Sequence, residues 1–389
     1  MLKGTKLHLL LIWITYSSIA VALSDFAQKK LLLPPPPTVN AQAYIIMDAK
    51  TGAILAQKDA DTEFAPASLT KLMTSYIIFH ALEQGHIGLN DPIHISTNAW
   101  RSEGSRLFLS ENSTASLQTL LKGLIITSGN DASVALSEHF AGSEDSFAVI
   151  MNRYAEKIGL THSHFVTATG LDHPDHFSSA KDIATLSQHI IEEFPQYFHW
   201  FHERSITHNG ITQNNRNSLL FHHPEIDGLK TGYTSKAGYC LSTTAQKNNT
   251  RLIVVTLNSS TPKYRNSDTL SLLNYGFRFF ESALLYPKDT IITSVPVYLG
   301  VINNVDLKVQ NASWASLPKG SRDEIQLSID IDQPIQAPLS VNQSVGSISV
   351  TLDGEFITSY PLYPSEDVQE SRGVSYLISY IKMFFSKWF

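Results

Sequence analysis

Ala65-Pro-Ala-Ser68-Leu-Thr-Lys71-Leu-Met-Thr74 is the stretch that decides the fold and chemistry of this chain. Pro66 favours a helix start here, and the following apolar residues have helical spacing. Residues three apart share a helix face, so the Lys71 amine can reach the Ser68 hydroxyl. The helix N-terminus offers free N–H groups to a developing oxyanion, and burial lowers a lysine pKa. The stretch therefore predicts a Ser-Lys nucleophile pair for acyl transfer.

Two further motifs follow in order, Ser128-Gly-Asn130 and Lys230-Thr-Gly232. A serine hydroxyl and an amide in the first can relay a proton and hold a substrate peptide carbonyl, although a helix cap explains that motif better when it is taken by itself. In the second, Gly232 lets a substrate backbone lie against a strand. Lys230 and Thr231 can bind a terminal carboxylate, and the second ammonium disfavours protonation of the first lysine. Each motif alone recurs by chance elsewhere in the chain, so their order carries the argument.

The three motifs in this order are the signature of penicillin-binding proteins and serine β-lactamases. The chain resembles the low-molecular-mass D-alanyl-D-alanine carboxypeptidases in its longer strings. These strings are Ala65–Thr74, Thr127–Ser133, Asp227–Thr234 and Asn215-Arg216-Asn217. The resemblance implies an α+β fold, with a β-lactamase/transpeptidase-like catalytic domain in which helices flank an antiparallel sheet. It also implies a small C-terminal all-β sandwich and a terminal amphipathic helix.

The resemblance also implies roles for individual residues. Ser68 is the acylated nucleophile, Lys71 its general base, and Ser128 the proton shuttle to the leaving amine. Backbone N–H groups of Ser68 and Tyr233 form the oxyanion hole. The implied substrate-binding residues are Asn130, Arg216, Lys230, Thr231, Gly232 and Tyr233. The implied substrate is the peptidoglycan stem peptide, which loses its terminal D-alanine, and β-lactams acylate the same serine.

Composition excludes several other classes. The 389 residues carry a net charge of −6, with 43% hydrophobic and 16% charged residues, which excludes a disordered chain and gives no global basic signal for nucleic acid. One cysteine, Cys240, excludes an internal disulfide framework and a cysteine-ligated zinc site. The histidine clusters lack the H-E-x-x-H pattern, so we expect surface or core histidines, and neither a metal nor a cofactor. These clusters are His162-x-His164, His173-x-x-His176 and His222-His223.

The N-terminus is typical of an exported protein. Lys3 and Lys6 precede an apolar segment, Leu7 to Ala22, with small residues at Ala20 and Ala22 and a second candidate cleavage site at Ala27. We expect a signal peptide over residues 1–27, a Pro-rich spacer over 28–38 and a catalytic domain over 39–285. Export with a lone cysteine indicates a bacterial envelope.

Patterns along the catalytic domain predict a hairpin over residues 43–57, helices within 115–160 and 179–195, strands over 239–245 and 251–257, and a closing helix over 270–284. From 286 to 366 short alternating segments predict an all-β sandwich. Its expected strands cover residues 295–299, 305–309, 325–331, 348–352 and 356–360.

The C-terminal segment, residues 367–389, predicts an amphipathic helix. Ser375, Ser379, Lys382 and Ser386 recur along one helical face, and apolar and aromatic residues fill the rest. Such a helix lies in a membrane surface, which predicts a peripheral protein on the periplasmic face of the inner membrane. The alternative is a helix docked on the protein's own core.

Three other functions are alternatives to the carboxypeptidase activity. A class A β-lactamase carries an E-x-x-L-N segment between the second and third motifs, and the glutamates from Glu138 to Glu225 provide none. A D,D-endopeptidase of the same family stays open. A non-enzymatic envelope scaffold also stays open, and it predicts normal localisation without covalent labelling by a fluorescent penicillin.

Overall fold

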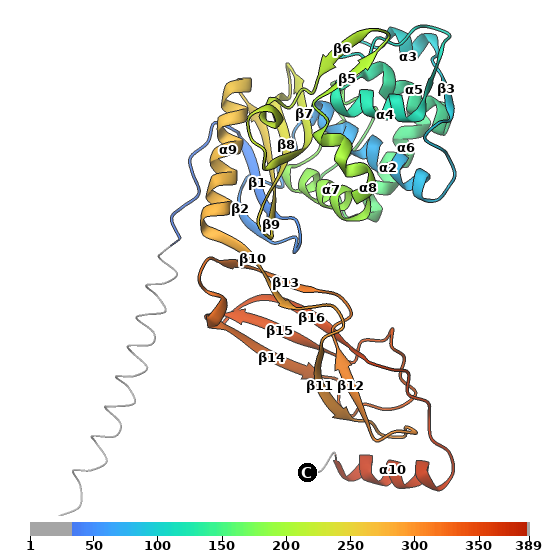
Figure 1. Cartoon of the computed structure of the whole chain (residues 1–389), viewed down its shortest axis with the longest axis vertical. Coiled ribbons are helices and arrows are strands. Elements are labelled where there is room, and N and C mark those ends of the chain that lie inside the picture. Colours follow the sequence, from blue (N-terminus) through green and yellow to red (C-terminus); the bar gives the residue numbers. More distant parts are fainter. Residues whose placement is uncertain (1–32, 387–389) are drawn as a thin grey trace, which may run out of the picture. The chain divides into compact units, whose positions relative to one another are not determined.

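The computed structural model describes residues 33–386. The expected signal peptide, the start of the spacer and the last three residues lie outside this range. The described chain forms two compact units, divided between Phe280 and Glu281 (Figure 1). Each unit has its own buried core, and each is described below by itself.

A five-stranded antiparallel sheet forms the centre of the unit from Pro36 to Phe280, in the order β2-β1-β9-β8-β7. The predicted hairpin is confirmed as β1 and β2, and the two predicted strands are confirmed as β8 and β9. The bounds are β1 Ala43–Asp48, β2 Ile54–Lys58, β7 Ile226–Thr234, β8 Gly238–Lys247 and β9 Thr250–Ser259.

Helices cover both faces of this sheet, because side chains along a strand alternate between the faces. Ile46 and Val254 pack in the same cluster as Leu272 of α9, whereas Ile45 and Val255 belong to the large cluster of the other helices. The bounds are α2 Lys71–Glu83, α3 Thr97–Arg101, α4 Leu117–Ile126, α5 Asn130–Ala141, α6 Glu144–Lys157, α7 Ala180–Glu193, α8 Pro195–Phe198 and α9 Pro262–Phe279.

The predicted helix over 270–284 is wrong at its end. Helix α9 ends at Phe279, and the chain continues as strand β10, Phe280–Tyr286. Strand β10 pairs with β13, Ser313–Pro318, which the sequence did not predict. Ala283 is buried with Ala315 and Leu317 in a small core. Pairing with a strand thirty residues away therefore outweighs the local helical preference.

The second unit contains the predicted all-β domain. Its larger sheet has the order β11-β12-β16-β15-β14, and β10 and β13 form a second, two-stranded sheet. The expected strand over 295–299 is only partly correct, because β11 ends at Pro296. The bounds are β11 Ile291–Pro296, β12 Asn304–Lys308, β14 Ile325–Ile331, β15 Gly346–Leu352 and β16 Glu355–Pro364.

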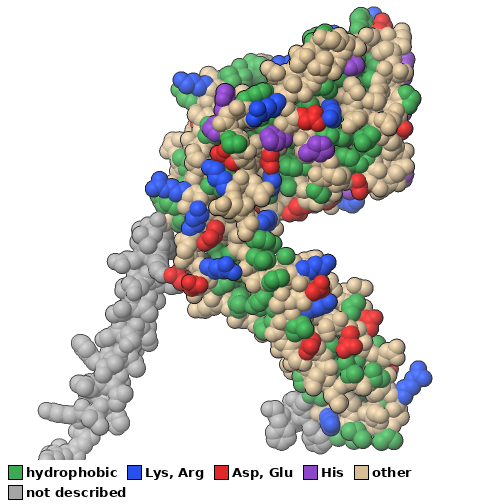
Figure 2. All heavy atoms as spheres, viewed as in Figure 1, with side chains coloured by type: hydrophobic (Ala, Val, Ile, Leu, Met, Phe, Trp, Pro, Cys, Tyr) green, Lys and Arg blue, Asp and Glu red, His purple; other side chains and the backbone are tan. Residues whose placement is uncertain are grey.

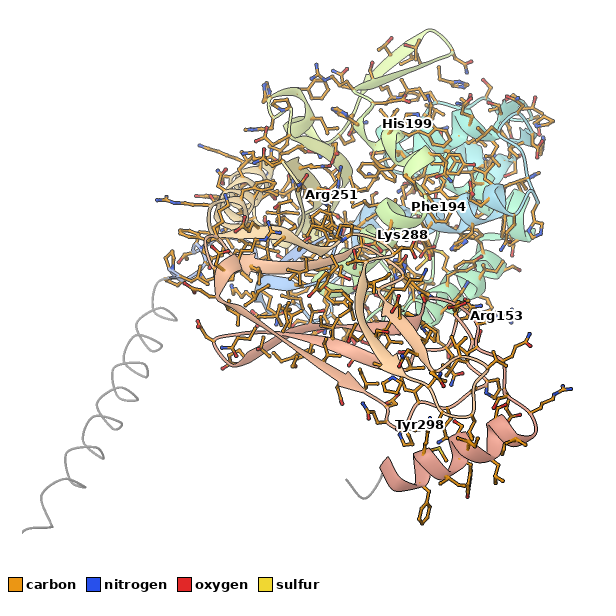
Figure 3. All side chains as sticks on the ribbon, turned by 60° about the horizontal axis from the view of Figure 1, so that its bottom comes forward. Arg153, Phe194, His199, Arg251, Lys288 and Tyr298 are labelled. Atoms are coloured by element: carbon orange, nitrogen blue, oxygen red, sulfur yellow. The ribbon has the colours of Figure 1, made fainter. Side chains whose placement is uncertain are left out.

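Helix α10, Val374–Ser386, follows the last strand of this unit. Its polar side is tied to the β domain, since Ser379 Oγ accepts a hydrogen bond of 2.7 Å from Leu299 N and Met383 is buried. In Figure 3 the helix lies beside the segment that carries Tyr298. The outward side is apolar, as Figure 2 also shows, and its exposed residues are Val374, Leu377, Ile378, Tyr380, Ile381 and Phe384. Among residues 33–386, every helix is too short or too polar to cross a bilayer.

Candidate active site

The turn that carries Ser68 is a 3₁₀ helix, Ala67–Thr70, and the α-helix α2 begins only at Lys71. Side chains three residues apart are eclipsed in a 3₁₀ turn, which brings the serine and lysine still closer than an α-helix does. Lys71 Nζ lies 2.9 Å from Ser68 Oγ. The structure thus brings the two predicted residues into hydrogen-bond contact.

Lys71 is completely buried, with 0% of its side chain exposed. Burial lowers the pKa of Lys71 to about 7, and the carboxylates of Glu144 and Asp131 oppose this shift. Nζ lies 2.7 Å from both Asn130 Oδ1 and the carbonyl oxygen of Thr169. A neutral amine donates two hydrogens and keeps one lone pair. With these two acceptors satisfied, the lone pair is available to the Ser68 hydroxyl.

The turn from Ser128 to Asn130 joins α4 to α5. Ser128 has a φ of 62°, which is uncommon for a residue with a side chain, and its buried Oγ has no hydrogen-bond partner within the described chain. A buried hydroxyl without a partner is available to a bound molecule. Asn130 N donates to Ser105 O at 2.7 Å, which ties this turn to the next wall of the site.

Asp131 supports the same wall and was not predicted as a site residue. Its carboxylate accepts hydrogen bonds from Leu107 N at 2.8 Å and from Leu109 N at 3.1 Å. The side chain is completely buried. It therefore fixes the segment over residues 104–109 against α5. The only signal in the sequence was its position directly after Asn130.

The Lys230-Thr-Gly232 motif lies in the second half of β7. A Cβ at Gly232 would lie 3.2 Å from Ser68 N and 3.0 Å from Pro66 O, so glycine lets β7 pack against the nucleophile turn more closely than most side chains would. Lys230 is 2% exposed. Burial, followed by the charges of Lys71 and Arg216, holds the pKa of Lys230 well below its usual value.

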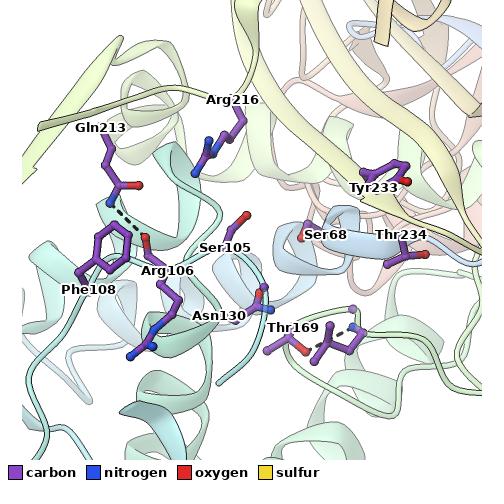
Figure 4. Close-up of a pocket in the computed structure, with 13 residues that line it drawn as sticks. Ser68, Ser105, Arg106, Phe108, Asn130, Thr169, Gln213, Arg216, Tyr233 and Thr234 are labelled. Carbon is purple, nitrogen blue, oxygen red and sulfur yellow. Dashed lines mark hydrogen bonds between the residues drawn. The ribbon is translucent and has the colours of Figure 1, made fainter. Parts of the chain in front are cut away.

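A cavity of about 400 Å³ opens beside these elements (Figure 4). Four predicted residues line it, and Lys71, Ser128, Lys230 and Thr231 are buried and do not line it. Tyr233 is 56% exposed and stacks on Tyr239 at 4.3 Å between ring centroids. The lining residues are Ser68, Gly104, Ser105, Arg106, Phe108, Asn130, Thr169, Gly170, Leu171, Gln213, Arg216, Tyr233 and Thr234.

The loop over residues 167–176 forms another wall, which sequence reasoning missed. A Cβ at Gly170 would lie 1.9 Å from Ala67 O, and its φ is +82°, so the loop needs glycine to approach the nucleophile turn. Thr234 Oγ1 donates to Asp172 Oδ1 at 2.7 Å and connects the loop to β7. No motif spacing in the sequence connects this loop to Ser68.

All histidines of the described chain lie in the unit from Pro36 to Phe280. Figure 2 shows those visible in this view as separate patches. His176 is buried, whereas His162 and His173 have side chains that are 40% and 44% exposed. Within residues 33–386 no three His, Cys, Asp or Glu side chains are grouped so that they could hold a metal ion.

Known proteins are similar to this chain in sequence and in structure. Residues 31–261 match the family described as D-alanyl-D-alanine carboxypeptidase (Peptidase S11), and residues 280–370 match the C-terminal domain of penicillin-binding protein 5. The chain is 36% identical to the D-alanyl-D-alanine carboxypeptidase DacA of Escherichia coli (strain K12), over 95% of this chain and 94% of that protein. It is 39% identical to DacA of Haemophilus influenzae, over 92% of this chain and 93% of that protein.

Solved structures give the same result. Penicillin-binding protein 5 of Haemophilus influenzae matches with a TM-score of 0.83 and 39% identity, over 87% of this chain and 100% of that chain. Penicillin-binding protein D2 of Listeria monocytogenes, in its ampicillin-bound form, matches with a TM-score of 0.58 and 29% identity, over 62% of this chain and 100% of that chain.

Proposed function

The chain belongs to the Peptidase S11 family of D-alanyl-D-alanine carboxypeptidases, and on this premise we propose how its own residues remove the terminal D-alanine from peptidoglycan stem peptides. The protein is a serine-type D-Ala-D-Ala carboxypeptidase and a penicillin-binding protein. One observation carries the assignment of roles: a fully buried Lys71 amine, with a pKa of about 7, lies 2.9 Å from the Ser68 hydroxyl.

Acylation begins with this pair. Neutral Lys71 removes the proton from Ser68 Oγ, which attacks the carbonyl carbon between the last two D-alanines. The oxyanion is bound by the backbone N–H groups of Ser68 and Tyr233, and the close packing of Gly232 on Ser68 N supports this pairing. The hydroxyl of Ser128, which has no hydrogen-bond partner in the described chain, gives its proton to the leaving amine and takes up the proton that Lys71 removed from Ser68. The C–N bond breaks and D-alanine leaves.

The acyl-enzyme on Ser68 is then hydrolysed by water, which restores the serine and releases the shortened peptide. Asn130 orients the substrate from the cavity wall, where its amide also holds Lys71. A β-lactam acylates the same serine: Ser68 Oγ attacks the lactam carbonyl and the ring C–N bond breaks. Its leaving group stays attached after the ring opens, so it does not vacate the site.

The terminal carboxylate of the substrate is held by Lys230 and Thr231, with Arg216 at the cavity wall. In the free protein, burial and the neighbouring Lys71, Arg216 and Arg265 lower the pKa of Lys230. A bound carboxylate supplies the anion that this buried amine lacks, and so favours the ammonium form. Substrate binding and protonation of Lys230 are therefore coupled.

We propose that the enzyme acts in the cell envelope. We assign residues 1–27 to a cleaved signal peptide and the protein to the periplasmic face of the inner membrane. The exposed apolar side of α10 supports peripheral attachment, because its polar side already binds the β domain through Ser379.

The test is release of D-alanine from a pentapeptide by the purified enzyme and by a Ser68→Ala variant. We expect the variant to fold, to release no D-alanine above background and to take no label from fluorescent penicillin. A Ser75→Ala variant is the matched control, because Ser75 is a buried serine of α2 outside the cavity lining. Persistent release or labelling in the Ser68→Ala variant would refute the nucleophile assignment.

A further inference from the structure

His176 is a buried histidine next to the site that the proposed mechanism does not use. Its side chain is 2% exposed. Ring atom Nδ1 accepts hydrogen bonds from Val166 N at 3.1 Å and Thr167 N at 3.3 Å, so it carries no proton. The proton of the neutral ring is then on Nε2, which donates to Thr70 Oγ1 at 2.8 Å. The geometry thus fixes one tautomer.

The two ring nitrogens form hydrogen bonds to two segments that both position Lys71. Thr70 directly precedes Lys71 in the nucleophile turn. The segment from Val166 leads within three residues to Thr169, whose carbonyl oxygen accepts from Lys71 Nζ at 2.7 Å. One imidazole therefore connects the backbone that carries the amine to the backbone that receives its hydrogen bond.

We propose that His176 is a positioning residue for the Ser68-Lys71 pair, acting as a neutral, Nε2-protonated clamp between Thr70 and the segment that presents Thr169. This inference rests on the roles proposed for Ser68 and Lys71. The clamp fixes where Nζ lies relative to the serine hydroxyl. A shift of about 1 Å between reacting groups is enough to slow a reaction by two orders of magnitude.

The surroundings keep the ring neutral. Burial, followed by the neighbouring His164, His173 and Lys71, lowers the pKa of His176 to about 4. The nearby carboxylate of Asp175 lies 3.9 Å from His173, and the Phe165 ring packs edge-on against the imidazole at 5.7 Å. A protonated ring would lose its acceptor for the two backbone N–H groups, so the clamp holds at the pH at which the enzyme acts.

The test compares His176→Phe, which keeps a packed ring but removes both hydrogen-bonding atoms, with His176→Gln, whose amide can still donate to Thr70. The rate of benzylpenicillin acylation is measured by intact-protein mass spectrometry from pH 5 to 9. We expect a fall of roughly 10- to 100-fold for His176→Phe, with the midpoint of the pH profile moved upward as water reaches the amine. His176→Gln should recover most of the rate, and His162→Phe, at an exposed histidine, should match the wild type.

Two results would overturn the proposal: a folded His176→Phe protein with the wild-type rate and pH profile, or equal losses in the Phe and Gln variants. Nitrogen-15 NMR of the wild-type imidazole decides the matter if the Phe variant does not fold. An Nε2-protonated neutral ring at pH 7 supports the clamp, and an Nδ1-protonated or charged ring contradicts it. Failure of the proposed function is separate, because it shows as penicillin labelling of Ser68→Ala protein.

Discussion

Lowering the pH from 8 to 5 is expected to slow the acylation of Ser68 by benzylpenicillin about 90-fold. The reason is that the amine of Lys71 acts only when neutral, and its pKa is about 7. The neutral fraction is then about 0.9 at pH 8, about 0.1 at pH 6 and about 0.01 at pH 5. A lysine with an ordinary pKa near 10.4 would instead give a rate that rises about tenfold per pH unit up to pH 10.

The assay is a single-turnover measurement with saturating benzylpenicillin, quenched in acid and read as the acylated fraction of intact protein. The carboxylate of benzylpenicillin stays ionised throughout this range and holds Lys230 in its ammonium form, so the maximal rate reports Lys71 alone. At sub-saturating concentration the rate should also fall at high pH, because free Lys230 has a lowered pKa and loses its charge.

Two outcomes would refute this reasoning. A maximal rate that is constant from pH 5 to 8 means that the buried amine does not act as the base. A rate that continues to rise to pH 10 means that burial does not lower the lysine pKa, and that Nζ is solvated in the working enzyme.

Three further predictions concern packing, the membrane and stability. Gly170→Ala should lower the free energy of unfolding by more than about 4 kcal/mol and abolish penicillin labelling. The control is Gly142→Ala, since Gly142 has a similar φ of +81° but open space around it. This variant should lower the free energy of unfolding, measured in urea, by only about 1–2 kcal/mol. Ile381→Asp on the apolar side of α10 should reduce vesicle binding at least about tenfold, and Ser375→Asp on the other side should not reduce it. D-alanine release should be unchanged in both variants. Equal vesicle binding by both variants contradicts the proposed membrane attachment. Since the folded state depresses the pKa of Lys71 from 10.5 to about 7, the unfolded chain binds more protons between these values, and stability must rise with pH. The free energy of unfolding of the wild type should gain about 3 kcal/mol relative to Lys71→Met between pH 7 and 9.5, and no relative gain would show that the amine is not buried.

Local patterns predicted the parts of the structure that depend on neighbours in the sequence. The spacing of Ser68 and Lys71 indicated their contact, although the turn is 3₁₀ rather than α-helical. The hairpin over residues 43–57 followed from alternation and a turn. Such features are fixed within a few residues, so a single sequence contains them.

Contacts between distant residues could not be predicted in the same way. The carbonyl of Thr169 lies 98 residues from Lys71, and His176 lies 106 residues from Thr70, so no local spacing connects them. The predicted helix over 270–284 extends wrongly into strand β10 for the same reason, because the partner strand β13 decides the conformation of β10. The His173-x-x-His176 pair could be noticed in the sequence, but only the fold shows that one member is buried beside the nucleophile turn.

The most direct test of the central claim is to map the residue that benzylpenicillin acylates. The protein is treated with the drug, digested with a protease, and its peptides are sequenced by tandem mass spectrometry. We predict one penicilloyl group, carried by Ser68 in the peptide that also contains Lys71. A penicilloyl group on any other residue, or an unmodified protein, would contradict the account.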